Sequence, residues 1–173
     1  RHARPAEPAP APETPPGEGL PPAPARRPVI VVGYGPVGRA VAEQVEQGRA
    51  PVTIVELNPQ TVRRQLELGR SIVFGDAREQ EVLETAGIEH AGAVVLTIPD
   101  EQATLAAIRL VRSLRPDIFI SARTDVLSQA MLAREAGADH VTVEEMATAD
   151  LMARQVIEQL DQRRPAPEEP QPA

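Results

Sequence analysis

Residues 29–38 read Val-Ile-Val-Val-Gly-Tyr-Gly-Pro-Val-Gly, a run of four β-branched residues followed by a segment with glycine at its first, third and sixth positions. A helical pattern follows, and the next apolar run ends at Glu56. A strand, a glycine turn, a helix, a second strand and an acid form the dinucleotide-binding fingerprint in its expected context. Gly33 permits the tight turn, Gly35 lets a pyrophosphate approach, and Gly38 lets the helix pack closely on the sheet. The sequence therefore predicts a nucleotide-binding Rossmann-like fold.

The glycine turn supplies the anion-binding groups of this predicted site. A pyrophosphate would lie at the N-terminus of the first helix, against free backbone N–H groups. Pro36 fits the first helical turn but has no N–H, so Gly35, Val37 and Gly38 are the expected donors. Tyr34 lies inside the turn, where it either covers a base or phosphate or packs in the core.

The composition excludes several classes of chemistry. The 173 residues include no cysteine, and all 18 basic residues are arginine, which excludes disulfides, cysteine–zinc sites and lysine Schiff bases. A net charge of −7 argues against nucleic-acid partners. The three histidines, His2, His90 and His140, are expected at the surface. We therefore expect no catalytic residue, no metal site and no enzymatic activity.

Two proline-rich segments flank one predicted folded unit. Residues 1–27 are expected to form a disordered Pro/Ala-rich linker, and 162–173 a disordered tail. Between them, residues 28–161 alternate strand and helix patterns, which predicts a doubly wound parallel six-stranded sheet with helices on both faces. The expected strands are 29–33, 52–56, 71–74, 93–97, 118–122 and 140–143. The expected helices are 36–48, 59–69, 78–86, 100–114, 126–136 and 145–161. The expected N-caps are Asn58, Asp100 and Asp125.

Four further candidates lie at the carboxyl ends of the predicted strands, where ligands of open parallel sheets bind. Glu56 is expected to accept hydrogen bonds from the ribose hydroxyls of an adenosine and to repel a 2′-phosphate, which disfavours NADP. Arg123 either binds a phosphate or forms a salt bridge to Glu56, Asp76 or a partner subunit. Asp76 forms a capping box with Glu79, lies beside an adenine, or does both. Thr97 either contacts a phosphate or is structural.

Four motifs together resemble a known family. They are Val-Val-Gly-Tyr-Gly-Pro-Val-Gly-Arg at 31–39, Ile-Val-Glu-Leu-Asn-Pro at 54–59, Phe-Gly-Asp-Ala at 74–77 and Gly-Ala-Asp at 137–139. In this order they resemble an RCK/KTN domain of the TrkA-N family over about residues 28–161. The strongest likeness is to the C-terminal cytosolic domain of Kef-type monovalent cation:proton antiporters.

The resemblance implies a domain that binds NAD(H) or an adenine nucleotide (AMP, ADP or ATP) and gates potassium or sodium transport. It also implies a homodimer formed by the last helix, here 145–161, as it crosses onto the neighbouring subunit. The chain starts at Arg1, and we expect a longer parent protein in which the linker follows an integral-membrane antiporter domain. The fragment itself is expected to be soluble, at the cytoplasmic face of the inner or plasma membrane.

The family's functional positions map onto this sequence motif by motif. They correspond to Gly33, Gly35, Gly38, Glu56, Asp76, Ala77, Thr97 and Arg123, and the expected site also includes Tyr34, Pro36, Val37 and Leu57. Calcium-gated relatives have carboxylates where this chain has Thr97 and Arg123, so metal sensing is not expected. Two other functions stay open: a nucleotide-binding domain of an NAD-dependent oxidoreductase without its catalytic domain, and a structural dimerisation module.

Overall fold

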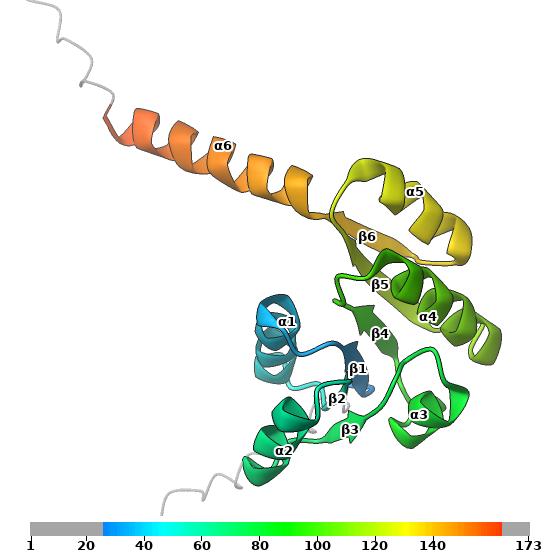
Figure 1. The fold of residues 1–173 in the computed structure, drawn as a ribbon. Helices are drawn as coiled ribbons and strands as arrows, with labels where there is room; N and C mark the ends of the chain where they lie inside the picture. Colours follow the sequence, from blue (N-terminus) through cyan, green and yellow to red (C-terminus); the bar gives the residue numbers. More distant parts are fainter. Residues whose placement is uncertain (1–25, 164–173) are drawn as a thin grey trace, which may run out of the picture.

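Short runs of Val, Ile, Leu and Ala form the strands, because β-branched residues fit a pleated surface buried on both faces. The computed structural model describes residues 26–163, in which all strands pair in parallel in the order β3-β2-β1-β4-β5-β6 (Figure 1). The strands are β1 (Val29–Val32), β2 (Val52–Glu56), β3 (Ile72–Phe74), β4 (Ala93–Leu96), β5 (Phe119–Thr124) and β6 (His140–Val143). The helices are α1 (Pro36–Gln47), α2 (Pro59–Glu67), α3 (Gln80–Thr85), α4 (Glu101–Leu114), α5 (Leu127–Ala136) and α6 (Glu144–Gln162).

The predicted fold class is confirmed, and the strand order is that of a Rossmann fold. Each expected element is present, and most ends differ by one or two residues. The predicted linker at 1–27 and tail at 162–173 lie outside the described residues, apart from 26–27 and 162–163.

The helices cover the two faces of the sheet unequally. Helices α1 and α2 lie on one face, and α3, α4 and α5 lie on the other (Figure 1). The larger buried cluster includes Leu83, Ile108 and Ile120, and the smaller one packs α1 and α2 on β1 and β2 around Val31 and Ile54. The α1–α2 face is left uncovered over β5 and β6, where Phe119 is half exposed.

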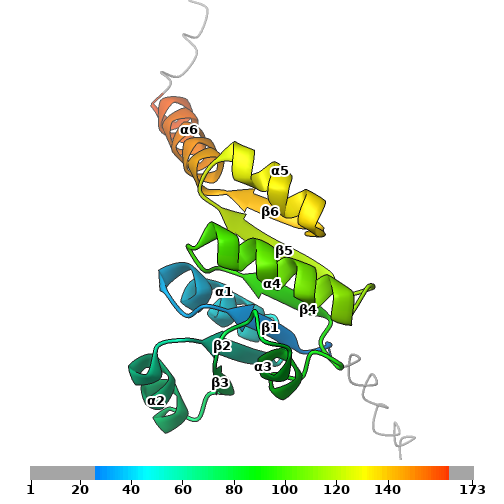
Figure 2. The same cartoon turned by 45° about the vertical axis from the view of Figure 1, so that its right-hand side comes forward.

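Helix α6 projects away from the β6 edge of the sheet (Figures 1 and 2). None of its residues is buried. The helix exposes large apolar side chains, at Met146, Leu151, Met152, Val156, Ile157 and Leu160. A helix normally gains most of its stability from packing an apolar face, and the apolar side chains of α6 have no such packing among residues 26–163. No helix among residues 26–163 has both the length and the apolar content to span a membrane.

Two of the three predicted N-caps are confirmed. The Asn58 side chain accepts hydrogen bonds from the backbone N–H groups of Gln60 and Thr61, and Asp100 accepts one from Ala103. The prediction for Asp125 is wrong, because α5 begins later, with Val126 as its N-cap and no side-chain cap.

Arg112, in the last turn of α4, connects this helix to the loop before β5 and to the loop before β6. Its guanidinium donates to the carbonyl of Gly137 at 2.7 Å, to those of Pro116 and Ile118 at 2.8 Å each, and to the Asp139 carboxylate at 2.8 Å. Burial raises the pKa of Asp139, but the Ile120 N–H and Arg112 outweigh it and hold that pKa below its ordinary value. The Gly-Ala-Asp motif thus has a structural role here.

We predict that Arg112→Ala destabilises the domain by about 2–3 kcal/mol, because three carbonyl groups lose a charged donor. Urea unfolding followed by circular dichroism measures this change. Arg109→Ala is the matched control, since Arg109 is exposed on the same helix, and its effect is expected within about 0.5 kcal/mol. Equal stability of the two variants would contradict the structural role of Arg112.

Candidate functional site

The glycine turn after β1 packs so closely that two of its glycines have no room for a side chain. Gly33 has a φ of +90°, a left-handed conformation that favours glycine. A Cβ on Gly38 would lie 2.0 Å from the Gly33 carbonyl oxygen and 2.7 Å from the Thr97 hydroxyl oxygen. A Cβ on Gly35, by contrast, would meet nothing within 4 Å. The roles predicted for Gly33 and Gly38 therefore follow from packing, and Gly35 faces open space.

This open space lies beside unpaired backbone donors. Pro36 occupies the first turn of α1, and the first N–H of the helix to pair is that of Arg39, which donates to the Gly35 carbonyl at 2.9 Å. Within residues 26–163, the N–H groups of Gly35, Val37 and Gly38 have no backbone acceptor outside the helix. An anion at this helix N-terminus would find these donors and the positive end of the helix dipole.

Glu56 is held in place at the end of β2 by backbone groups. One carboxylate oxygen accepts the Tyr34 N–H at 2.7 Å, and the other accepts the Asn58 N–H at 2.8 Å. Each oxygen has a second lone pair, so both remain available to hydroxyl donors such as those of a ribose. The Glu56 carboxylate is thus fixed beside the glycine turn.

Thr97 has the structural role that the sequence left open. Its side chain is buried, and its hydroxyl lies 2.9 Å from the Val32 carbonyl oxygen and 3.1 Å from that of Gly33. The single hydroxyl proton is shared between these two acceptors. Thr97 therefore ties the end of β4 to the end of β1.

A crevice runs from the glycine turn toward the start of α6. It has a volume of about 440 Å³. Its lining residues come from α1, the ends of β4, β5 and β6, and the first turns of α6, and include Val37, Thr97, Ser121, Arg123, Thr142, Glu144 and Thr148. The crevice therefore brings together three of the predicted site residues, Val37, Thr97 and Arg123.

Arg123 is paired with acidic residues of the same chain. Its guanidinium donates to Glu144 at the start of α6 and to Asp125 at 2.9 Å. The predicted salt-bridge partners Glu56 and Asp76 are wrong, because Arg123 ends β5, which lies beside β6 and the start of α6. Its Nε is buried without a partner among the described residues.

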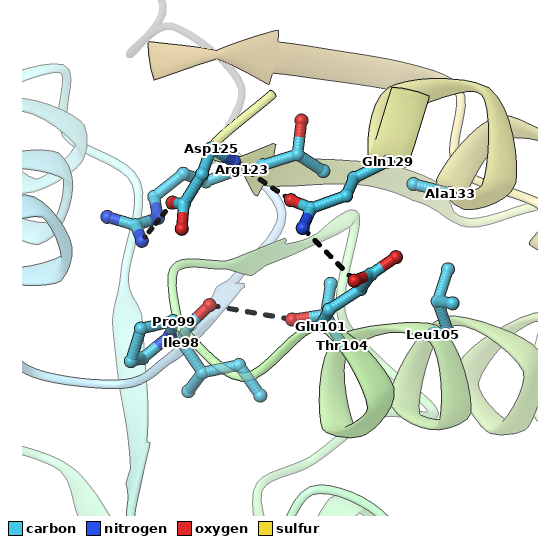
Figure 3. Close-up of a pocket in the computed structure, with 10 residues that line it drawn as sticks. Ile98, Pro99, Glu101, Thr104, Leu105, Arg123, Asp125, Gln129 and Ala133 are labelled. Carbon is cyan, nitrogen blue, oxygen red and sulfur yellow. Dashed lines mark hydrogen bonds and ion pairs between the residues drawn. The ribbon is translucent and has the colours of Figure 1, made fainter. Parts of the chain in front are cut away.

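The polar network extends behind Arg123 to the N-termini of α4 and α5 (Figure 3). Gln129 accepts the Asp125 N–H at 3.2 Å and donates to Glu101 at 3.0 Å, so one side chain connects the two helices. The enclosed space among these residues is about 10 Å³, room for one water molecule at most. This pocket is a packing feature.

Asp76 is engaged with its own loop. It accepts the backbone N–H of Arg78 at 2.9 Å, and the Arg78 guanidinium holds the pKa of Asp76 below its ordinary value. The predicted capping box is wrong, since Glu79 itself is the N-cap of α3 and makes no side-chain cap. Ala77 is buried beside Asp76, and Leu57 is exposed next to Glu56.

The Tyr34 ring packs in the core under α1 and α2, with only 5% of the residue exposed. The packing interpretation is therefore confirmed, and only its backbone N–H reaches Glu56. The sequence interpretation missed Glu144 and the hydroxyl groups of Ser121, Thr142 and Thr148. The alternation of Ser121 and Arg123 along β5 was the one available signal, because residues two apart point to the same face.

A parallel sheet in this order, a glycine turn at a helix N-terminus and an acid at the end of β2 define the class of Rossmann-type domains. Residues 29–144 match the model of the TrkA-N domain family. The chain belongs to this family.

Known relatives agree with this assignment. The chain is 30% identical over 123 residues to the "Putative cation/proton antiporter YbaL" of Escherichia coli (strain K12), covering 71% of this chain and 22% of that protein. The crystal structure of the TrkA-N domain of Escherichia coli inner membrane protein ybaL matches with a TM-score of 0.72 and 29% identity, over 75% of this chain and 96% of that chain.

Two ligand-bound structures share the fold at lower identity. The Shewanella denitrificans Kef C-terminal domain in its AMP-bound form matches with a TM-score of 0.67 and 22% identity, over 77% of this chain and 80% of that chain. The GsuK channel bound to NAD matches with a TM-score of 0.69 and 24% identity, over 84% of this chain and 28% of that chain.

We predict that Gly38→Ala destabilises the domain by about 3 kcal/mol or more, because the new methyl group overlaps the Gly33 carbonyl. Gly35→Ala is the matched control and is expected to change stability by less than about 1 kcal/mol, since its Cβ meets open space. Thermal unfolding of both variants checks the difference. A stable Gly38→Ala domain would contradict the packing role of this glycine.

Proposed function

We propose that this domain binds NAD(H) or an adenine nucleotide and thereby regulates a cation/proton antiporter, of potassium or sodium ions. One observation carries the proposal. Free backbone N–H groups at the N-terminus of α1 and the fixed carboxylate of Glu56 lie side by side at the same edge of the sheet. The first group suits a phosphate and the second suits ribose hydroxyls.

The relatives support both parts of the proposal. YbaL is named as a cation/proton antiporter, and the chain spans about a fifth of its length. The Kef domain and the GsuK channel contain AMP and NAD respectively in proteins of the same fold. In the parent protein, the domain would lie at the cytoplasmic face of the membrane and follow the integral-membrane antiporter part.

We also propose that the bound nucleotide acts as a signal and is not consumed. In the described crevice, Arg123 and Glu144 already pair with each other. The other polar side chains of the lining are the hydroxyl groups of Thr97, Ser121, Thr142 and Thr148. Such a lining can hold a ligand, and its one carboxylate, that of Glu144, is held in an ion pair with Arg123 and not kept free for proton transfer. The alternatives are an oxidoreductase domain and a structural module, which nucleotide-binding and turnover assays separate.

We predict that the purified chain binds at least one of NAD⁺, NADH, AMP, ADP and ATP in calorimetry. Glu56→Ala is expected to weaken binding about tenfold or more, because two hydroxyl contacts to a charged acceptor are lost. Gly35→Asp is expected to weaken it further, because its carboxylate occupies the anion position. His140→Ala is the control and leaves binding unchanged, since His140 is exposed on β6.

The same measurement discriminates between the functions. Failure of all five nucleotides to bind or to raise the melting temperature would favour the structural module. Hydride transfer from NADH to an added substrate would favour the oxidoreductase. Unchanged binding by Glu56→Ala would contradict the proposed ribose contact.

The exposed helix α6 supports a further part of the proposal, a homodimer. Met152, Val156 and Leu160 recur at intervals of four residues, so they form one apolar stripe along the helix. Helix α5 exposes Leu127 and Met131 in the same way. Exposed apolar surfaces of this kind mark protein interfaces, and a second copy of the chain supplies a complementary one.

We predict that the chain is a dimer in light scattering and that Val156→Glu raises the dimer dissociation constant at least about tenfold, because a charge enters an apolar contact. Arg154→Gln changes the net charge by the same amount and is the control. Arg154 and its partner Asp150 are largely exposed, so the control should dimerise normally. A monomeric wild-type chain would contradict this part of the proposal.

A further inference from the structure

A second pocket lies between α1 and α2, away from the crevice described above. It has a volume of about 260 Å³. Its walls are largely polar and contain three arginines. The lining residues are Tyr34, Arg39, Glu43, Thr61, Arg64, Gln65, Leu68 and Arg70. The proposed nucleotide site uses only the backbone of Tyr34, so the side chains of this pocket have no assigned role.

Two buried side chains in this pocket lack hydrogen bonds. Tyr34 is 5% exposed and Gln65 is 8% exposed. Among residues 26–163, neither the Tyr34 hydroxyl nor the Gln65 carboxamide pairs with a protein group. These two polar groups are not sealed from solvent, because within residues 26–163 the buried side-chain polar atoms without a partner are the Arg123 Nε and the Thr124 hydroxyl oxygen, so both groups are open to a hydrogen-bonding ligand. Both residues line the pocket, where a ligand can accept hydrogen bonds from them.

The charges around these two groups are unbalanced. Arg70 is paired with Glu46 at 2.9 Å, whereas Arg39 and Arg64 form no salt bridge with any described residue. The guanidinium carbons of Arg39 and Arg70 lie 5.7 and 5.8 Å from the centre of the Tyr34 ring, which holds two cations at the pocket. Glu43 is the one acid in the lining, so the pocket retains an excess of positive charge.

We propose that this α1–α2 pocket binds a small anion with several acceptor oxygens, a phosphate or a carboxylate, at a site separate from the nucleotide site. Guanidinium groups pair with such oxygens through charge-assisted hydrogen bonds. The Tyr34 hydroxyl and the Gln65 amide donate to the same ligand. The volume suits a compact anion, because pockets for larger ligands begin at roughly 300 Å³.

Tyr34 connects this pocket to the glycine turn. Tyr34 lines the pocket, its ring lies beside the guanidinium groups of Arg39 and Arg70, and its backbone N–H donates to Glu56 at 2.7 Å. An anion in the pocket therefore contacts the residue that fixes the Glu56 carboxylate. The two sites share one residue and no ligand-contacting side chain.

The test titrates the full chain with inorganic phosphate and with citrate while amide signals are followed by NMR, at ionic strength matched with sodium chloride. We expect saturable shifts at Thr61, Arg64 and Gln65 with at least one of the two anions. The double variant Arg39→Gln/Arg64→Gln should weaken binding at least about tenfold, because it removes two charged donors. Tyr34→Phe keeps the ring and should weaken binding several-fold.

Two controls make the result decisive. Arg63→Gln removes one positive charge next to Arg64 on the exposed part of α2 and should leave binding unchanged. Gly35→Asp blocks the proposed nucleotide site and should also leave it unchanged. Absence of saturable shifts, an equal loss in Arg63→Gln, or shifts confined to the glycine turn that vanish in Gly35→Asp would each overturn the proposal.

Discussion

The contact between the Gly33 carbonyl, Gly38 and the Thr97 hydroxyl fixes the geometry on which the site depends. Because no side chain separates Gly38 from Gly33, α1 starts directly over the end of β1. The Thr97 hydroxyl bonds the carbonyl groups of Val32 and Gly33, and it thereby joins the end of β1 to the neighbouring strand β4. The N–H groups of the first helical turn therefore point outward at the carboxyl edge of the sheet, and the protein leaves them without a backbone acceptor. The position proposed for an anion therefore results from packing alone.

Much of this arrangement was predictable from sequence because it is encoded locally. A few consecutive residues are enough to predict each of its parts: the β-branched strands, the glycine turn and the Asn58-Pro59 helix cap. Asp76 and Asp125 were predicted less well. Each has an arginine two residues away, and these neighbours pair with the carboxylates in place of the expected helix caps. Residue type marks a cap, but it does not reveal a competing partner.

The partner of Arg123 was missed for a different reason. Glu144 lies far along the chain and becomes adjacent only because β6 pairs with β5, with Arg123 opposite Thr142. A pattern of strands and helices gives fold class, whereas register decides which side chains meet at the ends of the strands. The ion pair between Arg123 and Glu144 consequently links the crevice to the first turn of α6, which no sequence motif indicated.

The two halves of the sheet differ in how complete they are. Around β1, β2 and β3, both faces are covered, and polar groups without a partner lie at the glycine turn and in the α1–α2 pocket. Around β5 and β6, the Arg123 Nε is buried without a partner among the described residues, but one face of the sheet is open and α6 exposes several large apolar side chains. Unpaired polar groups suit a small polar ligand, and exposed apolar side chains suit contact with another protein surface. The proposed nucleotide site therefore lies in the first half of the sheet and the proposed dimer surface in the second, and the crevice extends from α1 to the first turns of α6, so it connects the two.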